Sequence, residues 1–131
     1  MKIHELGHVV LYVTDIVKST SFYRDILGFR LIGTASGMTA FSSGRTHHEL
    51  LLIEIGGKVK VKKNIEPGLY HIGFKIGNTD QELKLALQEL RQAKVGIIGT
   101  ADHTVTHSLY IKDPDGNEIE LYVDVSQEWK K

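Results

Sequence analysis

Two histidines and one glutamate stand where they could hold a metal ion together. His8 and His71 lie in short runs of β-branched and aromatic residues, and Glu120 lies in a third such run. The chain has no cysteine, so any metal must be bound through nitrogen and oxygen atoms. Two imidazoles and one carboxylate form a facial set that leaves up to three positions open on an octahedral ion such as Fe(II). We therefore predict a metal site made by these three residues, with Fe(II) as the first choice and Mn(II), Ni(II), Co(II) or Zn(II) as alternatives.

The elements that must position these residues repeat twice along the chain. A strand-length run opens each half and leads to a helix cap, which is Asp15 in the first half and a capping box of Thr79 and Glu82 in the second. Three further strand-like runs, separated by turn residues, complete each half. The expected elements are a strand at 7–13, a helix from Asp15 to Gly28, strands at 29–33, 38–42 and 49–55, a strand at 70–76, a helix from Thr79 to Gly96, and strands at 97–100, 107–112 and 118–123.

This order of elements predicts an α+β fold with two βαβββ modules in a single domain, 1–131. A unit that cannot bury its face alone packs against its copy. The paired modules should therefore form a curved mixed sheet around a metal-binding cleft, where the three ligands could converge. The expected divisions are module one at 4–57, a polar connector at 58–68, module two at 69–124 and a C-terminal tail at 125–131.

Composition narrows the possible partners. Lysine plus arginine (16) balances aspartate plus glutamate (16), so a broad positive field for nucleic acid or anionic lipid is not expected. Apolar residues make up 41% of the chain, and no apolar run approaches the ~18 residues of a membrane span. The first residues are too polar for a secretory signal. We expect a cytoplasmic protein that binds neither nucleic acid nor membrane.

Several motifs resemble the glyoxalase, bleomycin-resistance and type I extradiol dioxygenase superfamily, whose fold is called vicinal oxygen chelate. The opening motif is His8 followed by Val-Val-Leu-Tyr-Val, then Ser19, Phe22-Tyr23 and Leu27-Gly28-Phe29. The second half is similar to the narrower extradiol dioxygenase signature through His103, Leu109-Tyr110, Asp113-Pro114, Gly116 and Glu120. Ala101 departs mildly from that signature. The whole pattern is most similar to single-domain proteins of the catechol 2,3-dioxygenase type.

The resemblance implies a role for each motif residue. The implied iron ligands are His8, His71 and Glu120, the implied acid/base residue is His48, the implied hydrogen-bond donor to the substrate oxygen is Tyr110, and the implied substrate-pocket histidine is His103. The implied reaction is extradiol ring cleavage of a catechol-type aromatic substrate by O₂. A homodimer is compatible with this reading.

Two other functions stay open at this point. A glyoxalase I-like lyase or isomerase is typified by a fourth ligand, a glutamate in the last strand of the first half. Here His48 occupies the position that corresponds to Glu120, since each comes four residues after a glycine, and Glu49 and Glu54 lie nearby. Strand alternation puts Glu54 on the face of His48, so a shifted register could deliver a carboxylate. A non-catalytic protein that binds an aromatic compound or antibiotic is the third possibility.

Overall fold

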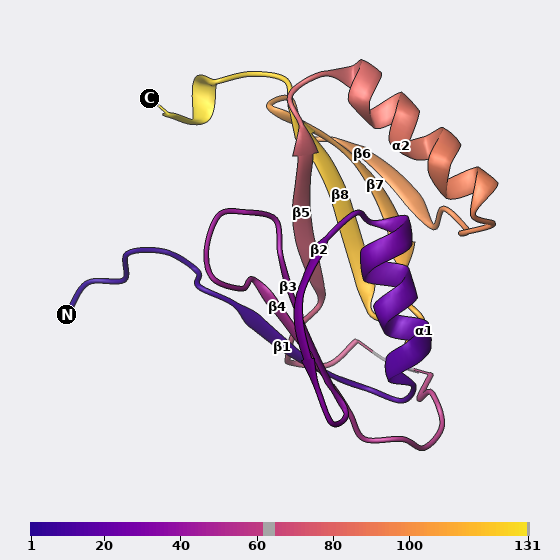
Figure 1. The fold of residues 1–131 in the computed structure, drawn as a ribbon. Helices are drawn as coiled ribbons and strands as arrows, with labels where there is room; N and C mark the ends of the chain where they lie inside the picture. Colours follow the sequence, from indigo (N-terminus) through magenta and orange to yellow (C-terminus); the bar gives the residue numbers. More distant parts are fainter. Residues whose placement is uncertain (62–64, 131) are drawn as a thin grey trace. The chain divides into compact units, whose positions relative to one another are not determined.

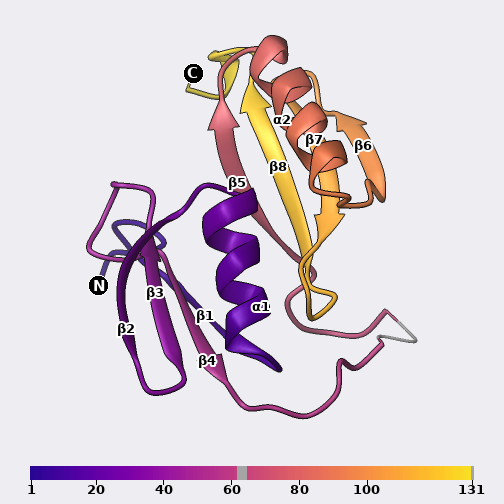
Figure 2. The same cartoon turned by 45° about the vertical axis from the view of Figure 1, so that its right-hand side comes forward.

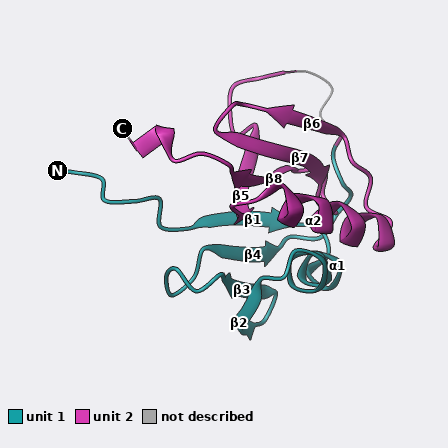
Figure 3. Ribbon diagram, turned by 90° about the horizontal axis from the view of Figure 1, so that it is seen from above, with its two compact units in different colours: residues 1–60 teal, residues 61–131 magenta. Residues whose placement is uncertain are grey.

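The computed structural model of the chain describes residues 1–61 and 65–130. Part of the connector expected at 58–68 and the last residue of the tail therefore lie outside the described residues. The chain divides into two compact units, Met1–Lys60 and Val61–Lys131 (Figure 3). Each unit contains one of the two expected modules. The pairing of the modules into one domain around a cleft stays a prediction.

Both units run strand, helix and three strands, which confirms the α+β class and the two βαβββ modules (Figure 1). Unit 1 contains β1 (Val9–Val13), α1 (Ile16–Ser21), a π-helical turn η1 (Phe22–Ile26), β2 (Arg30–Ala35), β3 (Met38–Ser42) and β4 (Leu50–Glu54). Unit 2 contains β5 (His71–Gly77), α2 (Asp80–Gln92), β6 (Gly99–Asp102), β7 (Thr106–Lys112), β8 (Glu118–Asp124) and a 3-10 helix η2 (Glu128–Lys130). No helix among the described residues is long and apolar enough to cross a membrane.

The two sheets have the same topology. Their strand orders are β1-β4-β3-β2 and β5-β8-β7-β6. In each sheet the first and last strands of the module are parallel neighbours, and the remaining pairs are antiparallel. The strand that begins with His71 is therefore hydrogen-bonded to the strand that carries Glu120.

One helix covers one face of each sheet, and Figure 2 shows α2 lying along the second sheet. In β8 the residues that face α2 are Ile119, Leu121 and Val123, all at most 4% exposed. Burial of each such side chain contributes about 1.5–3 kcal/mol, so this alternation is strongly fixed. The matching core of unit 1 is made by Leu11, Val13, Phe22, Tyr23, Phe41, Leu50 and Leu52.

The helix starts follow the sequence closely. The carboxylate of Asp15 accepts hydrogen bonds from the N–H groups of Val17 and Lys18 at the start of α1. At the start of α2, Thr79 and Glu82 form the expected capping box. Glu82 folds back over the end of β5, where a Cβ on Gly77 would collide with its carboxylate. A side chain at position 77 would therefore displace this carboxylate and break the capping box.

One helix end and one strand differ from the expectation. The helix after Asp15 continues as a π-helical turn to Ile26 with Leu27 as its cap, and Gly28, with a φ of 81°, follows the cap as expected. The helix after Thr79 ends at Gln92 rather than at Gly96, because Lys94 takes the left-handed conformation with a φ of 59°. The N–H of Val95 then bonds the carbonyl of Leu90 at 2.9 Å, as in a Schellman motif.

The strand expected at 97–100 is β6, Gly99–Asp102. The register with β7 sets this position, since Gly99 pairs with Tyr110 and Asp102 pairs with His107. The apolar pair Ile97-Ile98 suggested an earlier start. The other strands begin or end within two residues of the expected positions.

Candidate functional site

The face of the second sheet opposite α2 carries polar side chains. By strand alternation, β8 presents Glu118, Glu120, Tyr122 and Asp124 on this face. The register aligns Gly73, Glu120 and Tyr110 in one row across three strands. A Cβ on Gly73 would lie 3.4 Å from Oε2 of Glu120. The absence of a side chain at position 73 therefore leaves room for the Glu120 carboxylate.

Three side chains from two neighbouring strands meet the Glu120 carboxylate. Nε2 of His71 lies 3.1 Å from Oε2. The hydroxyls of Ser108 and Tyr110 both donate to Oε1, at 2.5 and 3.2 Å. The ring of His71 also meets the ring of Tyr110 edge to face, with centroids 5.7 Å apart. The structure thus brings together His71, Glu120 and Tyr110, three of the residues chosen from sequence.

The pair of His71 and Glu120 fits one metal ion. Two ligand atoms at about 2.1 Å from one ion and at right angles to each other lie roughly 3 Å apart. Nε2 of His71 and Oε2 of Glu120 have this separation. Ser108 and Tyr110 hold the other carboxylate oxygen, which fixes the orientation of the side chain. Hydrogen bonds of this kind commonly position a metal-binding carboxylate.

A second carboxylate, that of Glu118, lies near Nδ1 of the His71 ring. Oε2 of Glu118 is 3.5 Å from Nδ1 of His71, and both atoms are buried without a hydrogen-bond partner. A small movement would let Nδ1–H donate to Glu118, the arrangement usual for a metal-binding histidine. A hydrogen bond with Glu118, together with its charge, raises the pKa of the neighbouring Tyr70. Glu118 is therefore a candidate supporting residue for His71.

Tyr110 keeps its proton under ordinary conditions. Burial raises the pKa of its hydroxyl, and the charge of Glu120 and its hydrogen bond raise it further. A protonated phenol beside the proposed metal ligands can donate a hydrogen bond to an oxygen bound there. This is the role that the resemblance implied for Tyr110.

Three histidines gather in unit 1. His8 immediately precedes β1, and its ring centroid lies 4.5 Å from that of His48. Nδ1 of His48 lies 2.6 Å from Nδ1 of His47. Partial burial lowers the pKa of His48, the charges of His47 and His8 lower it further, and Glu49 opposes this change. The structure therefore brings together His8 and His48, the two chemical candidates of the first module.

The loop before β4 that holds His48 is organised by Glu49. Its carboxylate accepts hydrogen bonds from the N–H and hydroxyl of Ser43, at 3.0 and 2.6 Å, and from the N–H of Arg45 at 3.2 Å. Burial alone would raise the pKa of Glu49, but the hydrogen bonds from Ser43, Ser42 and Arg45 outweigh it and hold the pKa at about 2. Glu49 is thus a charged structural residue of the loop.

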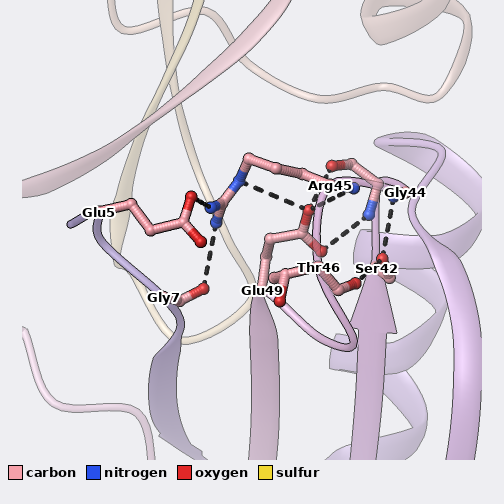
Figure 4. Close-up of polar contacts among 8 residues, drawn as sticks. Glu5, Gly7, Ser42, Gly44, Arg45, Thr46 and Glu49 are labelled. Carbon is pink, nitrogen blue, oxygen red and sulfur yellow. Dashed lines mark hydrogen bonds and ion pairs between the residues drawn. The ribbon is translucent and has the colours of Figure 1, made fainter.

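Arg45 ties the same loop to the segment before His8, as Figure 4 shows. Its guanidinium contacts Glu5 at 2.9 Å and donates to the carbonyl of Gly7 at 3.1 Å. The histidines of unit 1 therefore sit on two segments that one arginine connects. Arg45 was not among the residues chosen from sequence, because no motif distinguishes it from other surface arginines.

Glu54 serves the start of α1. Its Oε2 accepts a hydrogen bond from the N–H of Ile16 at 2.8 Å. Glu54 pairs with the buried Val13, so it lies on the helix-covered face of its sheet. The suggestion that Glu54 could share the face of His48 is not supported. Glu49 and Glu54, the carboxylates considered as a fourth ligand, both have local structural partners.

Two other histidines lie apart from Glu120. His103 is exposed in the turn between β6 and β7, where its N–H donates to the carbonyl of Thr106 at 2.9 Å. Its role as a substrate-pocket residue stays a prediction. His107 lies on the α2 side, and its ring contacts Asp80 at 2.6 Å and Asp102 at 3.3 Å. These contacts raise the pKa of His107, chiefly through the hydrogen bond to Asp80.

No three histidine, aspartate or glutamate side chains among the residues described are grouped to hold a metal ion. A three-ligand site needs His8 from unit 1 as well as His71 and Glu120 from unit 2. The convergence of the three ligands stays a prediction. Ser108 and Glu118 are site residues that the sequence analysis missed. Strand alternation from Tyr110 and Glu120 was the signal that could have found them.

A family model covers nearly all of this arrangement. The model of the Glyoxalase/Bleomycin resistance protein/Dioxygenase superfamily matches residues 5–121, which include most of both units and every site residue expected from the sequence. The chain belongs to this superfamily. The resemblance read from the motifs is thereby confirmed.

Relatives within the superfamily have different activities. The chain is 31% identical over 125 residues to Catechol-2,3-dioxygenase of Bacillus subtilis, a match that covers 93% of this chain but only 43% of that protein. It is 27% identical over 125 residues to Metallothiol transferase FosB of Staphylococcus epidermidis, with coverage of 93% and 83%. The chain thus spans less than half of its dioxygenase relative and most of its transferase relative.

The fold of the chain is also found among solved structures. A structure from the mobile metagenome of V. Pseudocholerae is similar to the chain, with a TM-score of 0.70 and 32% sequence identity. The match covers 97% of this chain and 98% of the other. The chain therefore shares its fold with a solved structure that it matches over nearly the whole length of both chains.

Proposed function

We propose that the protein is a metal-dependent extradiol dioxygenase that cleaves the ring of a catechol-type substrate with O₂. The observation that carries the proposal is the cluster on the open face of the second sheet. There His71 and Glu120 lie at the separation of adjacent metal ligands, and the Tyr110 hydroxyl contacts the same carboxylate. The similarity to a catechol-2,3-dioxygenase over most of the chain supports the same activity.

His8, His71 and Glu120 would hold the ion, with Fe(II) as the proposed metal. When bound, Fe(II) supplies coordination positions for the two catechol oxygens and for O₂, and the redox chemistry that joins them. All three ligands are nitrogen or oxygen donors. The other divalent ions named above remain alternatives for the same reason.

The residues around the ligands hold and move protons. Tyr110 keeps its proton, and its hydroxyl turns from Oε1 of Glu120 to donate its one hydrogen bond to a substrate oxygen. His48 accepts a proton from a catechol hydroxyl and returns it as the ring opens. For Nε2 of His48 to accept, Nδ1 must carry the hydrogen. The short contact between the Nδ1 atoms of His47 and His48 suits a hydrogen bond from His48 to His47.

The glyoxalase alternative is less well supported. It needs a carboxylate from the first module, and both candidates are engaged elsewhere, Glu49 with Ser43 and Arg45 and Glu54 with the start of α1. A metal-dependent thiol transferase is the second candidate, because the match to FosB covers 83% of that relative. The proposed dioxygenase reaction and the transferase reaction would both use His8, His71 and Glu120 as metal ligands.

The test is a direct assay of the two reaction types. Protein purified without oxygen and loaded with Fe(II) is mixed with catechol and air, and O₂ uptake and the yellow ring-opened product are followed. Parallel assays offer methylglyoxal with glutathione, and a small thiol with an electrophilic acceptor. We expect ring cleavage only. Turnover in a parallel assay without ring cleavage would move the protein to the isomerase or transferase group.

A further inference from the structure

An open depression of about 550 Å³ lies on the polar face of the second sheet. Its lining begins at Glu120 and continues through Lys75, Thr106, Tyr122, Asp124 and Trp129, all in unit 2. Volumes of this size hold small organic ligands. The depression is therefore continuous with the proposed metal ligand Glu120, and it extends from there toward the C-terminal ends of β5 and β8.

The far end of the depression presents a cation. Nζ of Lys75 lies 2.8 Å from Oδ2 of Asp124. The Asp124 side chain is only 10% exposed, whereas that of Lys75 is 41% exposed. An ammonium has three N–H donors, and Asp124 uses one of them. Lys75 can therefore donate to a ligand without losing its carboxylate partner.

The cation at the far end of the depression can meet an anionic group. The carboxylate of Asp124 is already paired with Lys75, so the remaining N–H groups of this ammonium can donate to a further oxygen. Oxygen acceptors with negative charge form stronger hydrogen bonds to an ammonium than neutral acceptors do.

Two aromatic rings line the space between the ends. Tyr122 lies opposite Lys75 in the register of the sheet, and burial raises the pKa of its hydroxyl, so it stays neutral. Trp129 comes from η2, is 57% exposed, and is the one tryptophan of the sequence. Aromatic faces of this kind pack against planar ligands. The lining is thus suited to a ring with a charged substituent.

The dimensions fit such a ligand. Glu120 and Asp124 are four residues apart in an extended strand, so their Cα atoms are about 13 Å apart. Side chains reach into the space from both ends and shorten the distance to be bridged. A benzene ring that carries a carboxylate on a short carbon chain can span the remainder.

We propose that this depression is the subsite for the substituent of the aromatic substrate, and that Lys75 selects substituents that carry a carboxylate. The inference rests on the proposed function, because it takes Glu120 as the end of the site that holds the metal. The specificity it assigns is a preference for acidic catechols over neutral ones of the same size.

Trp129 supplies a readout that does not depend on turnover. Metal-loaded protein without oxygen is titrated with (3,4-dihydroxyphenyl)acetate and, separately, with its methyl ester, and tryptophan fluorescence is measured. We expect the acid to bind about tenfold more tightly than the ester, the lower range for a hydrogen bond between charged groups at a partly exposed site. Lys75→Met should remove this preference, and Lys75→Arg should retain most of it.

Lys84→Met is the matched control, since Lys84 is exposed on α2, on the other side of the sheet. It should keep the preference. Lys75→Met leaves Asp124 without its partner and could unfold, so the double variant Lys75→Met/Asp124→Asn tests the same point with the charge balance kept. Equal affinities for acid and ester in the parent protein, or a preference that survives in the double variant, would overturn the proposal.

The titration and the ring-cleavage assay together separate the two proposals. A protein that prefers the acid but cleaves no ring keeps the subsite and loses the dioxygenase assignment. A protein that cleaves catechol rings but binds acid and ester equally keeps the dioxygenase assignment and loses the role of Lys75.

Discussion

The two modules share an order of elements and differ in the side chains they bring together. In the first module the rings of His8 and His48 lie 4.5 Å apart, and His47 contacts His48. In the second module, the Glu120 carboxylate contacts His71 and the hydroxyls of Ser108 and Tyr110. The first module therefore supplies imidazoles, and the second supplies one imidazole, a carboxylate and two hydroxyl donors. The two modules therefore share their order of elements but not the kinds of side chain at their candidate sites.

The last-strand glutamates show how this difference arises. Glu54 in β4 pairs with Val13, lies on the helix side and binds the start of α1. Glu120 in β8 pairs with Gly73 and lies on the open side, while α2 is capped by its own Glu82. Successive strand residues point to opposite faces. The role of a carboxylate in this fold therefore depends first on the face of the sheet to which its position in the strand directs it.

The largest expected effect is the loss of metal from variants of the proposed ligands, compared with a variant of Glu54 on the opposite face of its sheet. His8→Ala, His71→Ala and Glu120→Ala should each reduce the metal content from about one ion per chain to nearly none, because a three-ligand site cannot spare a member. Elemental analysis after Fe(II) loading measures the content, and circular dichroism verifies the fold. Glu54→Gln is the matched control and should keep the metal. Full occupancy in the three alanine variants would mean that these residues are not the ligands.

The next effect concerns the imidazoles of the first module. His48→Ala should retain the metal and slow ring cleavage by on the order of 10² to 10⁴, the usual contribution of a positioned acid/base group. Steady-state rates and metal analysis of the same sample decide this. His47→Gln keeps a hydrogen-bond acceptor beside His48 and should reduce the rate much less. If His48→Ala lost the metal, His48 would be a fourth ligand.

A smaller effect is expected for the hydroxyl of the second module. Tyr110→Phe removes one hydrogen-bond donor and leaves the ring, so turnover should fall roughly tenfold. The loss should appear in kcat more than in catechol affinity, because the bond is proposed to strengthen during the reaction. Tyr12→Phe, at an exposed site in β1, should change neither constant. A Tyr110→Phe protein as fast as the parent would exclude a role for this hydroxyl.

The smallest effect concerns stability on the helix side of the second module. Asp80 raises the pKa of His107 in the folded protein, so the contact stabilises the fold below pH of about 6.5 and is lost as pH rises through the raised value. His107→Gln should therefore lower the free energy of unfolding at mildly acidic pH and change it little at alkaline pH. Urea unfolding at the two pH values measures this. Metal content should not change, and an equal loss at both pH values would contradict the assignment.

Much of the fold could be predicted because its signals are local. Asp15 and the Thr79-Glu82 pair mark helix starts by their own hydrogen bonds, and the apolar alternation of β8 fixes its buried face. The end of α2 could not be predicted in the same way. Lysine rarely adopts the left-handed conformation, so Gly96 was the better signal than Lys94. The position of β6 was likewise set by pairing with β7 and not by its own residues.

The site was only partly predictable for a similar reason. His71, Glu120 and Tyr110 belong to motifs, and the structure brings them into contact. Ser108 carries no motif, although its hydroxyl makes the shortest of the contacts to Glu120. Arg45 connects segments 38 residues apart in the sequence, a contact that neither spacing nor periodicity indicates.

The capping box at the start of α2 should also couple the amide hydrogen exchange of the end of β5 to that of the first turn of α2. The Glu82 carboxylate accepts from the N–H groups of Asn78 and Thr79 at 2.6 and 3.1 Å, directly after the last residue of β5. These amides precede the helix, yet they can exchange with solvent only when the carboxylate swings away. The first turn of α2 and the end of β5 should thus open together, and the strand that carries His71 and Lys75 gains an end that does not fray on its own.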